Sequence, residues 1–221
     1  MTLQQPAPRP VQPVVRKSGW RFGLRYGIWF VVIIWGVFLL EILTGGYLAE
    51  FGIHPLDVNS LLYVFTSPVL HADLGHIMSN TVPGALFAFL IAISGKRVFW
   101  QVTVLCVVIG GFGTWLFGGI GTNHIGASGL IYGWLGYLLI RGFFNKSIVQ
   151  VILGIVLFFL YGGLIWGVFP QGMGISWQGH LFGFLAGAGC GIWLKSDDPI
   201  KQLTAASHAT SYPSVPPASA R

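Results

Sequence analysis

Six apolar stretches, separated by short polar segments, occupy most of this chain. They cover Phe22–Leu43, Gly75–Ile93, Val98–Phe117, Ser128–Phe144, Ile148–Val168 and Trp177–Leu194. Apolar stretches of about 18 residues or more are typical of membrane-spanning helices. In lipid every backbone amide needs a partner, and these stretches lack the alternating polarity of barrel strands, so we expect all six to be α-helices. The pattern predicts an all-α, polytopic membrane protein with six transmembrane helices.

The composition supports this fold class. Of the 221 residues, 54% are hydrophobic and only 8% are charged, with a mean hydropathy of +0.73, whereas soluble domains are roughly a quarter charged. Residues 1–20 and 196–221 are rich in Pro, Ala, Ser and Gln, a composition typical of disorder. We therefore expect a disordered basic tail at 1–20, a membrane domain at 21–195 and a second disordered tail at 196–221.

The basic residues predict the orientation in the membrane. We interpret all twelve Lys and Arg residues as lying outside the helices: before the first stretch, between the second and third, between the fourth and fifth (Arg141 and Lys146), or after the sixth. The other loops hold Glu50, Asp57 and Asp73 instead. Because cytoplasmic loops carry an excess of Lys and Arg, we expect both termini in the cytoplasm and a location in the cell membrane. The net charge of +6 is then a topology signal, and no nucleic-acid partner is expected.

Few polar side chains lie within the apolar stretches, and polar groups in a membrane are candidates for function because they are costly there. They include Ser128, His180, His76 and Asn80. His76 and Asn80 are four residues apart and so lie on one helical face. At a rise of about 1.5 Å per residue, Ser128, His180 and Asn80 stand roughly 20, 22 and 24 Å from the cytoplasmic boundary. In a hydrocarbon core of about 30 Å they share one plane, which predicts a wet pocket that opens to the outer side.

A serine and a histidine at one depth indicate nucleophilic catalysis. Neutral imidazole can take the serine proton near pH 7, so Ser128 and His180 would form a catalytic pair without a third acid. The oxyanion that forms needs preorganised donors. The candidates are the side chains of His76 and Asn80 and the backbone N–H of Ser128 at a helix N-terminus.

Glycines flank the candidate serine and follow the candidate histidine. Gly126 and Gly129 would let a substrate backbone come close to Ser128. A stripe with a spacing of four residues follows along the sixth stretch: Gly179, Gly183, Gly187 and Gly191. Small residues at this spacing allow close helix packing, which would bring His180 against Ser128.

Three motifs make the chain resemble the rhomboid family of intramembrane serine proteases. "HADLGHIMSN" matches its H-x4-H-x3-N pattern, "GASGLIY" matches G-x-S-G with a tyrosine three residues after the serine, and "GHLFGFLAG" matches a histidine followed by G-x3-G. The resemblance covers about Phe22 to Leu194 and implies a rhomboid-like six-helix bundle. It implies Ser128 as nucleophile, His180 as general base, His76 and Asn80 as oxyanion donors and Tyr132 as a ring packed beside His180.

The resemblance also implies the class of substrate, which is a transmembrane segment of another membrane protein, cut near the outer face of the membrane. One departure is visible in the first long loop, where many members carry Trp-Arg and this chain has Leu62 and Tyr63. No H-E-x-x-H motif is present, so we expect no metal site, and no cofactor is expected.

Two other functional classes are weighed against a protease. A catalytically inactive rhomboid-like binder of membrane proteins would share the fold, but such proteins usually lose the serine or the histidine, and this chain keeps both. A channel or transporter needs a polar path to both sides, whereas polar groups here occur only in the outer halves of the helices. The substrate and the oligomeric state do not follow from the sequence.

The remaining histidines and the cysteines are interpreted as structural. His71 lies before the helix that carries His76 and off its polar face, and His54, His124 and His208 are expected in solvated loops or a tail. Cys106 and Cys190 lie within apolar stretches and are interpreted as packing residues.

Overall fold

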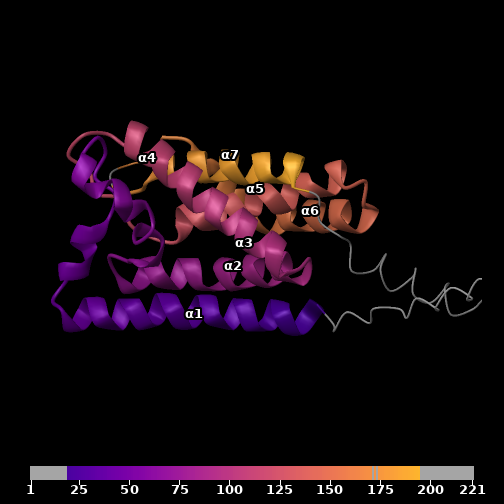
Figure 1. Cartoon of the computed structure of the whole chain (residues 1–221), viewed down its shortest axis with the longest axis horizontal. Helices are drawn as coiled ribbons and strands as arrows, with labels where there is room; N and C mark the ends of the chain where they lie inside the picture. The colour runs from indigo at the N-terminus through magenta and orange to yellow at the C-terminus, as the bar shows by residue number, and fades with distance from the viewer. Residues whose placement is uncertain (1–18, 171, 173, 195–221) are drawn as a thin grey trace, which may run out of the picture.

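The computed structural model describes residues 19–170, 172 and 174–194, which form a bundle of α-helices (Figure 1). The α-helices are α1 (Gly19–Leu43), α2 (Leu74–Ile93), α3 (Lys96–Leu105), α4 (Gly111–Phe117), α5 (Ser128–Phe144), α6 (Ile148–Tyr161) and α7 (Trp177–Trp193). The 3-10 segments are η1 (Tyr47–Phe51), η2 (Val58–Val64), η3 (Ser67–Val69) and η5 (Gly162–Val168), and η4 (Cys106–Gly110) is π-helical. The tails predicted at 1–20 and 196–221 lie outside these residues, apart from Gly19 and Trp20.

All six predicted stretches are helical, with ends that differ from the predicted ones by at most three residues. The described residues hold seven α-helices rather than six, because the π-helical segment Cys106–Gly110 divides the third stretch into α3 and α4. Four helical runs are long and apolar enough to cross a membrane: Gly19–Leu43, Leu74–Ile93, Lys96–Phe117 and Ile148–Val168. Helices α5 and α7 have 17 residues each, or about 26 Å at 1.5 Å per residue.

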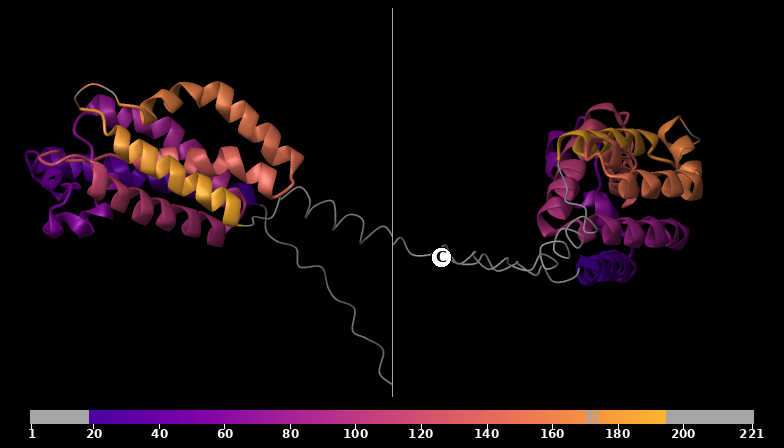
Figure 2. Two further views of the ribbon diagram at one scale, coloured as in Figure 1. Left: turned by 90° about the horizontal axis from the view of Figure 1, so that it is seen from above. Right: turned by 90° about the vertical axis from the view of Figure 1, so that its right-hand side faces the viewer.

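Helix α5 forms the centre of the bundle. Its side chains Trp134, Leu135, Tyr137 and Leu138 are almost completely buried. Helix α1 and the α6–η5 segment lie at the edges (Figure 2), and they expose large apolar side chains such as Trp29, Leu39, Phe159 and Trp166. Such an outward apolar surface suits lipid better than water.

Helices α5 and α7 share the most extensive contact of any two elements, and this contact depends on glycine. A Cβ atom at Gly183 would overlap the carbonyl oxygen of Gly129, and one at Gly187 would overlap that of Gly133. The helix backbones therefore touch directly, as expected from the stripe of small residues in the sequence. Because Ser128 begins α5 and His180 lies in the first turn of α7, this packing brings the two together.

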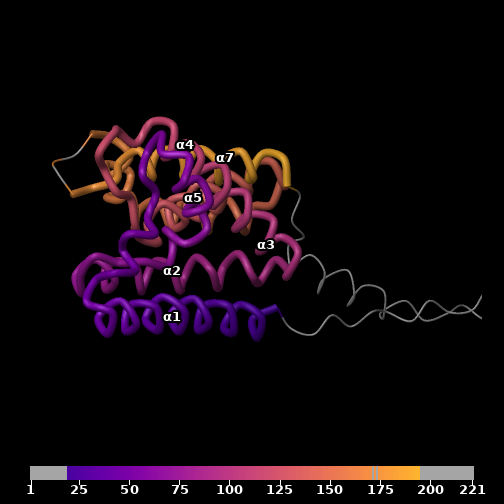
Figure 3. The backbone as a smooth tube through the Cα atoms, turned by 60° about the vertical axis from the view of Figure 1, so that its left-hand side comes forward, coloured from indigo at the N-terminus to yellow at the C-terminus, as the bar shows by residue number. Residues whose placement is uncertain are grey.

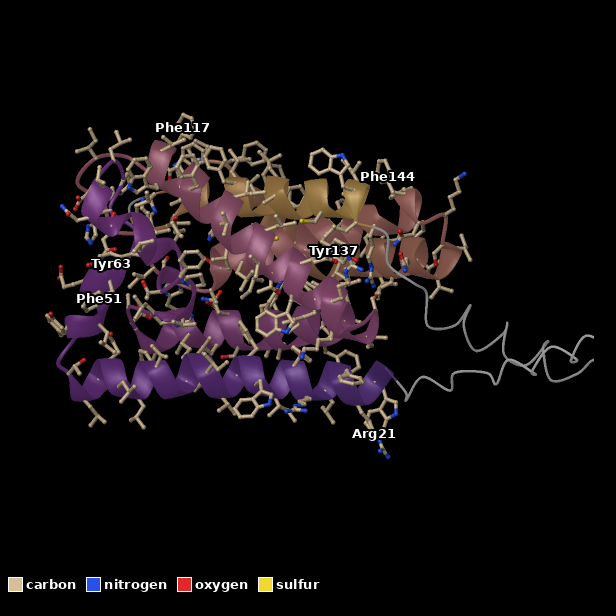
Figure 4. All side chains as sticks on the ribbon, in the orientation of Figure 1. Arg21, Phe51, Tyr63, Phe117, Tyr137 and Phe144 are labelled. Carbon is tan, nitrogen blue, oxygen red and sulfur yellow. The ribbon has the colours of Figure 1, made fainter. Side chains whose placement is uncertain are left out.

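The long connecting segments gather at one end of the bundle, and the short α2–α3 and α5–α6 connections lie at the other. The backbone between α1 and α2 climbs from α1 to α4 (Figure 3), where Trp115 Nε1 donates to the carbonyl of Asp57 at 2.9 Å. Phe51, Tyr63 and Phe117 lie at this end, and Arg21 and Phe144 at the opposite end (Figure 4). Helix α5 therefore begins with Ser128 at the loop end and finishes at the end that carries the described basic residues.

The position of Arg141 differs from the one predicted from the sequence, which was between two helices. It lies in the last turn of α5 and is buried, with 3% of its surface exposed. Its Nη1 donates to Ser94 Oγ at 2.8 Å, and its guanidinium group lies 5.3 Å from the centre of the Tyr137 ring. A buried guanidinium group needs a hydrogen-bond acceptor, and it is also stabilised over an aromatic ring. Because Ser94 ends α2 and Arg141 lies in the last turn of α5, the hydrogen bond joins the ends of these two helices.

We expect Gly187→Ala to destabilise the bundle, because the added methyl group meets the Gly133 carbonyl. Overpacking of this kind costs about 1 to 3 kcal/mol, and thermal unfolding in detergent micelles measures it. Gly36→Ala in α1 is the matched control, because nothing lies within 4 Å of a Cβ atom there. Equal melting temperatures for the two variants would contradict the packing described.

Candidate active site

Ser128 is held by a turn whose backbone is tied to the first loop. Gly126 has a φ of 118°, a conformation open to glycine and costly for other residues. Its N–H donates to the carbonyl of Ser67 at 2.9 Å, and the N–H of Ala127 donates to His71 Nε2 at 3.4 Å. Ser128 therefore enters the first turn of α5, where backbone N–H groups have no partner within the helix and carry partial positive charge.

A hydrogen bond joins the candidate nucleophile to the candidate base. His180 Nε2 lies 2.8 Å from Ser128 Oγ. The other ring nitrogen, Nδ1, lies 2.9 Å from the carbonyl oxygen of Gly167. Because a carbonyl oxygen can only accept, Nδ1 carries the hydrogen in neutral imidazole and Nε2 has its lone pair toward the serine. This tautomer is the one that takes a proton from Ser128.

The His180 ring is held on two further sides. The Tyr132 ring stacks on it, with ring centres 4.1 Å apart and planes 4° from parallel. Gly167 in η5 presses on both rings, since a Cβ atom there would overlap the Tyr132 hydroxyl and lie 3.2 Å from His180 Nδ1. The imidazole therefore has little room to turn away from Ser128.

The candidate oxyanion donors lie on α2, beside the serine turn. His76 packs its ring against Gly126, where a Cβ atom would lie 2.5 Å from both Cε1 and Nε2. Asp73 caps α2 by accepting the N–H of His76 at 2.8 Å. Asn80 is buried and donates through Nδ2 to the carbonyl of His76 at 3.1 Å. Among the described residues, no hydrogen bond joins either side chain to Ser128.

His71 packs against His76 and the turn before Ser128. It is completely buried, and its ring packs edge-to-face on His76 with centres 5.1 Å apart. Burial, together with the nearby His76, lowers the pKa of His71 to about 4. The ring is therefore neutral near pH 7 and accepts the Ala127 N–H, in agreement with its structural interpretation.

A cavity of about 40 Å³ lies beside the serine, lined by both backbone and polar side chains. Ser128, Gly129, His124 and Ser176 contribute to its wall. Apolar side chains line much of the rest of the wall. The volume is enough for a water molecule bonded to the polar part of the wall.

The structure corrects the interpretation of His124 as a solvated loop residue. His124 is 8% exposed, and its Nδ1 lies 2.6 Å from Ser176 Oγ. Sequence analysis also missed Ser176 and Gly167, whose roles depend on contacts between distant loops. The one available signal was the position of His124, four residues before Ser128 in a glycine-rich turn.

The other candidates take no part in the site. His54 is half-buried, and its Nε2 contacts the carbonyl of Glu50; His208 lies outside the described residues. Cys106 and Cys190 are buried free thiols; Cys106 also lines the cavity beside Ser128, but it makes no hydrogen bond to Ser128 or His180. Within the described part of the chain, no three His, Cys, Asp or Glu side chains are grouped so as to hold a metal ion.

Comparisons with known proteins identify the family of the chain. The family model for the rhomboid domain matches residues 58–196. An uncharacterized protein of Mycobacterium tuberculosis (strain ATCC 25618 / H37Rv) is 39% identical over 196 residues, which cover 84% of this chain and 82% of that protein. An uncharacterized protein of Mycobacterium leprae is 38% identical over 187 residues, covering 81% of this chain and 74% of the relative.

A Bacillus subtilis protein named "Putative rhomboid protease YdcA" is 31% identical over 126 residues, or 56% of this chain and 62% of that protein. The family model covers more than half of the chain, and it includes the segments that carry His76, Ser128 and His180. The chain therefore belongs to the rhomboid family and is an integral membrane protein.

Proposed function

We propose that this protein is an intramembrane serine endopeptidase that cuts transmembrane segments of other membrane proteins near the outer face of the membrane. The observation that carries the proposal is the 2.8 Å contact between Ser128 Oγ and His180 Nε2. The Gly167 carbonyl fixes the His180 tautomer that has the Nε2 lone pair toward Ser128, and this further supports the proposal. Membership of the rhomboid family supports the reaction class.

The first half of the reaction forms an acyl-enzyme. Ser128 Oγ attacks the scissile carbonyl carbon while His180 Nε2 takes the hydroxyl proton, and the carbonyl oxygen becomes an oxyanion. The imidazolium then gives this proton to the leaving amine as the C–N bond breaks. Stacking on Tyr132 and the bond to Gly167 keep the ring in place through both transfers.

The oxyanion needs donors that are in place before it forms. His76 packs against Gly126, two residues before the nucleophile, and Asn80 follows one turn later on α2. Their side-chain N–H groups and the backbone N–H of Ser128 are the donors we assign. The backbone group has the further advantage of the positive end of α5.

The second half of the reaction uses water. A water molecule that enters beside the His180 ring gives a proton to Nε2 and attacks the acyl carbon, and the serine then leaves with that proton. Gly126 and Gly129 keep the approach to the ester free of side chains. No metal ion or cofactor is needed for these steps.

We further propose that the chain crosses the cell membrane six times with both termini in the cytoplasm. The α3–α4 run then counts as one crossing, and the 17-residue helices α5 and α7 cross at the centre of the bundle. The site lies at the loop end, opposite the end where Arg21 lies (Figure 4). Because an excess of basic residues favours the cytoplasmic side, this arrangement supports an active site that faces the outer side.

An inactive rhomboid-like binder is the alternative function. It would have no need of a serine hydroxyl hydrogen-bonded to an imidazole of one tautomer. Both groups are present and joined, and burying them without use is costly in a membrane protein. The geometry therefore favours catalysis.

We expect Ser128→Ala and His180→Ala each to abolish cleavage of a model transmembrane substrate by the purified protein. Nucleophile and base act as a unit, so each loss should approach the roughly 10⁶-fold effect known for such pairs. Ser79→Ala and His54→Ala are matched controls, because their side chains contact only nearby backbone carbonyls. Cleavage by Ser128→Ala at the normal rate would exclude the mechanism.

The position of the cut in the substrate tests the depth of the site. Ser128 stands roughly 20 Å from the cytoplasmic boundary, so mass spectrometry of the fragments should find cleavage in the outer part of the substrate helix. Gly, Ala, Ser or Pro near the cut should favour cleavage, because they lower the cost of unwinding. Fragments cut near the cytoplasmic end would contradict an outward-facing site.

Labelling of introduced cysteines tests the orientation. Ile120→Cys, in the loop before α5 and 83% exposed, should react with an impermeant thiol reagent from outside intact cells. Lys146→Cys, at the other end of α5, should react only after the membrane is opened. Wild-type protein gives the background, since Cys106 and Cys190 are buried. The opposite pattern would reverse the proposed topology.

A further inference from the structure

His124 connects four segments of the chain at the loop end. Its backbone N–H and carbonyl exchange two hydrogen bonds of 2.9 Å with Ile53. Ser67 Oγ donates to the same carbonyl at 2.8 Å. The side chain reaches Gly118 after α4 and Ser176 before α7. No other histidine among the described residues is hydrogen-bonded to so many segments.

The hydrogen-bond partners define the tautomer of His124. Nε2 lies 3.1 Å from the carbonyl of Gly118 and 2.8 Å from Thr122 Oγ1. The Thr122 hydroxyl contacts the carbonyl of Gly119 at 2.7 Å, so its hydrogen is already used. Nε2 therefore donates, and Nδ1 accepts the hydroxyl hydrogen of Ser176 at 2.6 Å. Burial lowers the pKa of His124, which keeps this neutral form near pH 7.

The His124–Ser176 bond links the same two segments as the catalytic pair. His124 precedes Ser128 by four residues, and Ser176 precedes His180 by four residues. The carbonyl of Ser176 accepts the N–H of His180 at 3.1 Å, in the first turn of α7. A shift of Ser176 would therefore move the backbone that carries the general base.

We propose that His124 is a positioning residue that holds Ser176, and through it the first turn of α7, so that His180 stays within hydrogen-bond distance of Ser128. This inference rests on the proposed protease function and adds to it a residue outside the catalytic pair. The His124 backbone is itself held in place, because it is hydrogen-bonded to Ile53 and to the Ser67 hydroxyl. Misplacement of a catalytic group by about 1 Å costs up to roughly 10²-fold in rate.

Two conservative variants separate the two bonds of the His124 ring. The amide of Asn reaches the position of Nδ1 and keeps an acceptor for Ser176, whereas the longer Gln reaches the position of Nε2 and keeps the bonds to Gly118 and Thr122. We expect His124→Asn to retain kcat within about 3-fold. His124→Gln and Ser176→Ala should lose about 10- to 100-fold in kcat, with KM little changed.

The double variant His124→Ala with Ser176→Ala should have a kcat no lower than that of the slower single variant, because each substitution removes the same His124–Ser176 hydrogen bond. The rate of fluorophosphonate attachment to Ser128 should fall in parallel with kcat. His54→Ala is the histidine control and should match wild type. Melting temperatures in micelles show whether a loss of activity merely follows a loss of folding.

Equal kcat for the Asn and Gln variants, additive losses in the double variant, or losses that track the melting temperature would each overturn the positioning role. Failure of the proposed function is distinct, because it appears as cleavage by Ser128→Ala. A readout without activity is the Ser128 Oγ to His180 Nε2 separation in crystal structures of wild type, His124→Asn and His124→Gln. The proposal requires a longer separation in the Gln variant alone.

Discussion

The direct contact between the backbones of α5 and α7 is the constraint on which the site depends. Gly183 and Gly187 lie against carbonyl oxygens of Gly129 and Gly133, where even one methyl group would overlap. In lipid, helices gain little by burying apolar surface, so close packing of small residues carries much of their association. Because the proposed nucleophile Ser128 and the proposed base His180 lie in the first turns of these two helices, the packing that holds the bundle together also sets their separation.

Near this contact, a backbone carbonyl and an aromatic ring orient the His180 imidazole. In soluble Ser-His-Asp triads a carboxylate has this role. Gly167 sets the tautomer of His180, and Tyr132 covers one face of its ring. A buried carboxylate in the bundle would itself need a partner in a medium of low dielectric. A neutral carbonyl gives the same orientation at a smaller desolvation cost, which suits the interior of a membrane protein.

The helices were predictable from the sequence because their signal is local. The candidate pair also rests on a local signal, and its two side chains are in contact in the structure. Uninterrupted apolar runs predict helices, and rare polar groups such as Ser128, His180 and Asn80 stand out within them. The π-helical division at Cys106–Gly110 leaves the apolar run unbroken and so has no sequence signal. His124 and Arg141 were misplaced because their burial depends on partners distant in sequence, namely Ser176 for one and Ser94 for the other.

The cavity wall holds a second serine and histidine in contact, Ser176 and His124, so the identity of the nucleophile is the point to measure. Purified protein is treated with a labelled fluorophosphonate, and the modified serine is identified by mass spectrometry of its peptides. The account predicts the label on Ser128 and its loss in His180→Ala. Attachment to Ser176, or labelling of Ser128 that does not change when His180 is replaced, would contradict it.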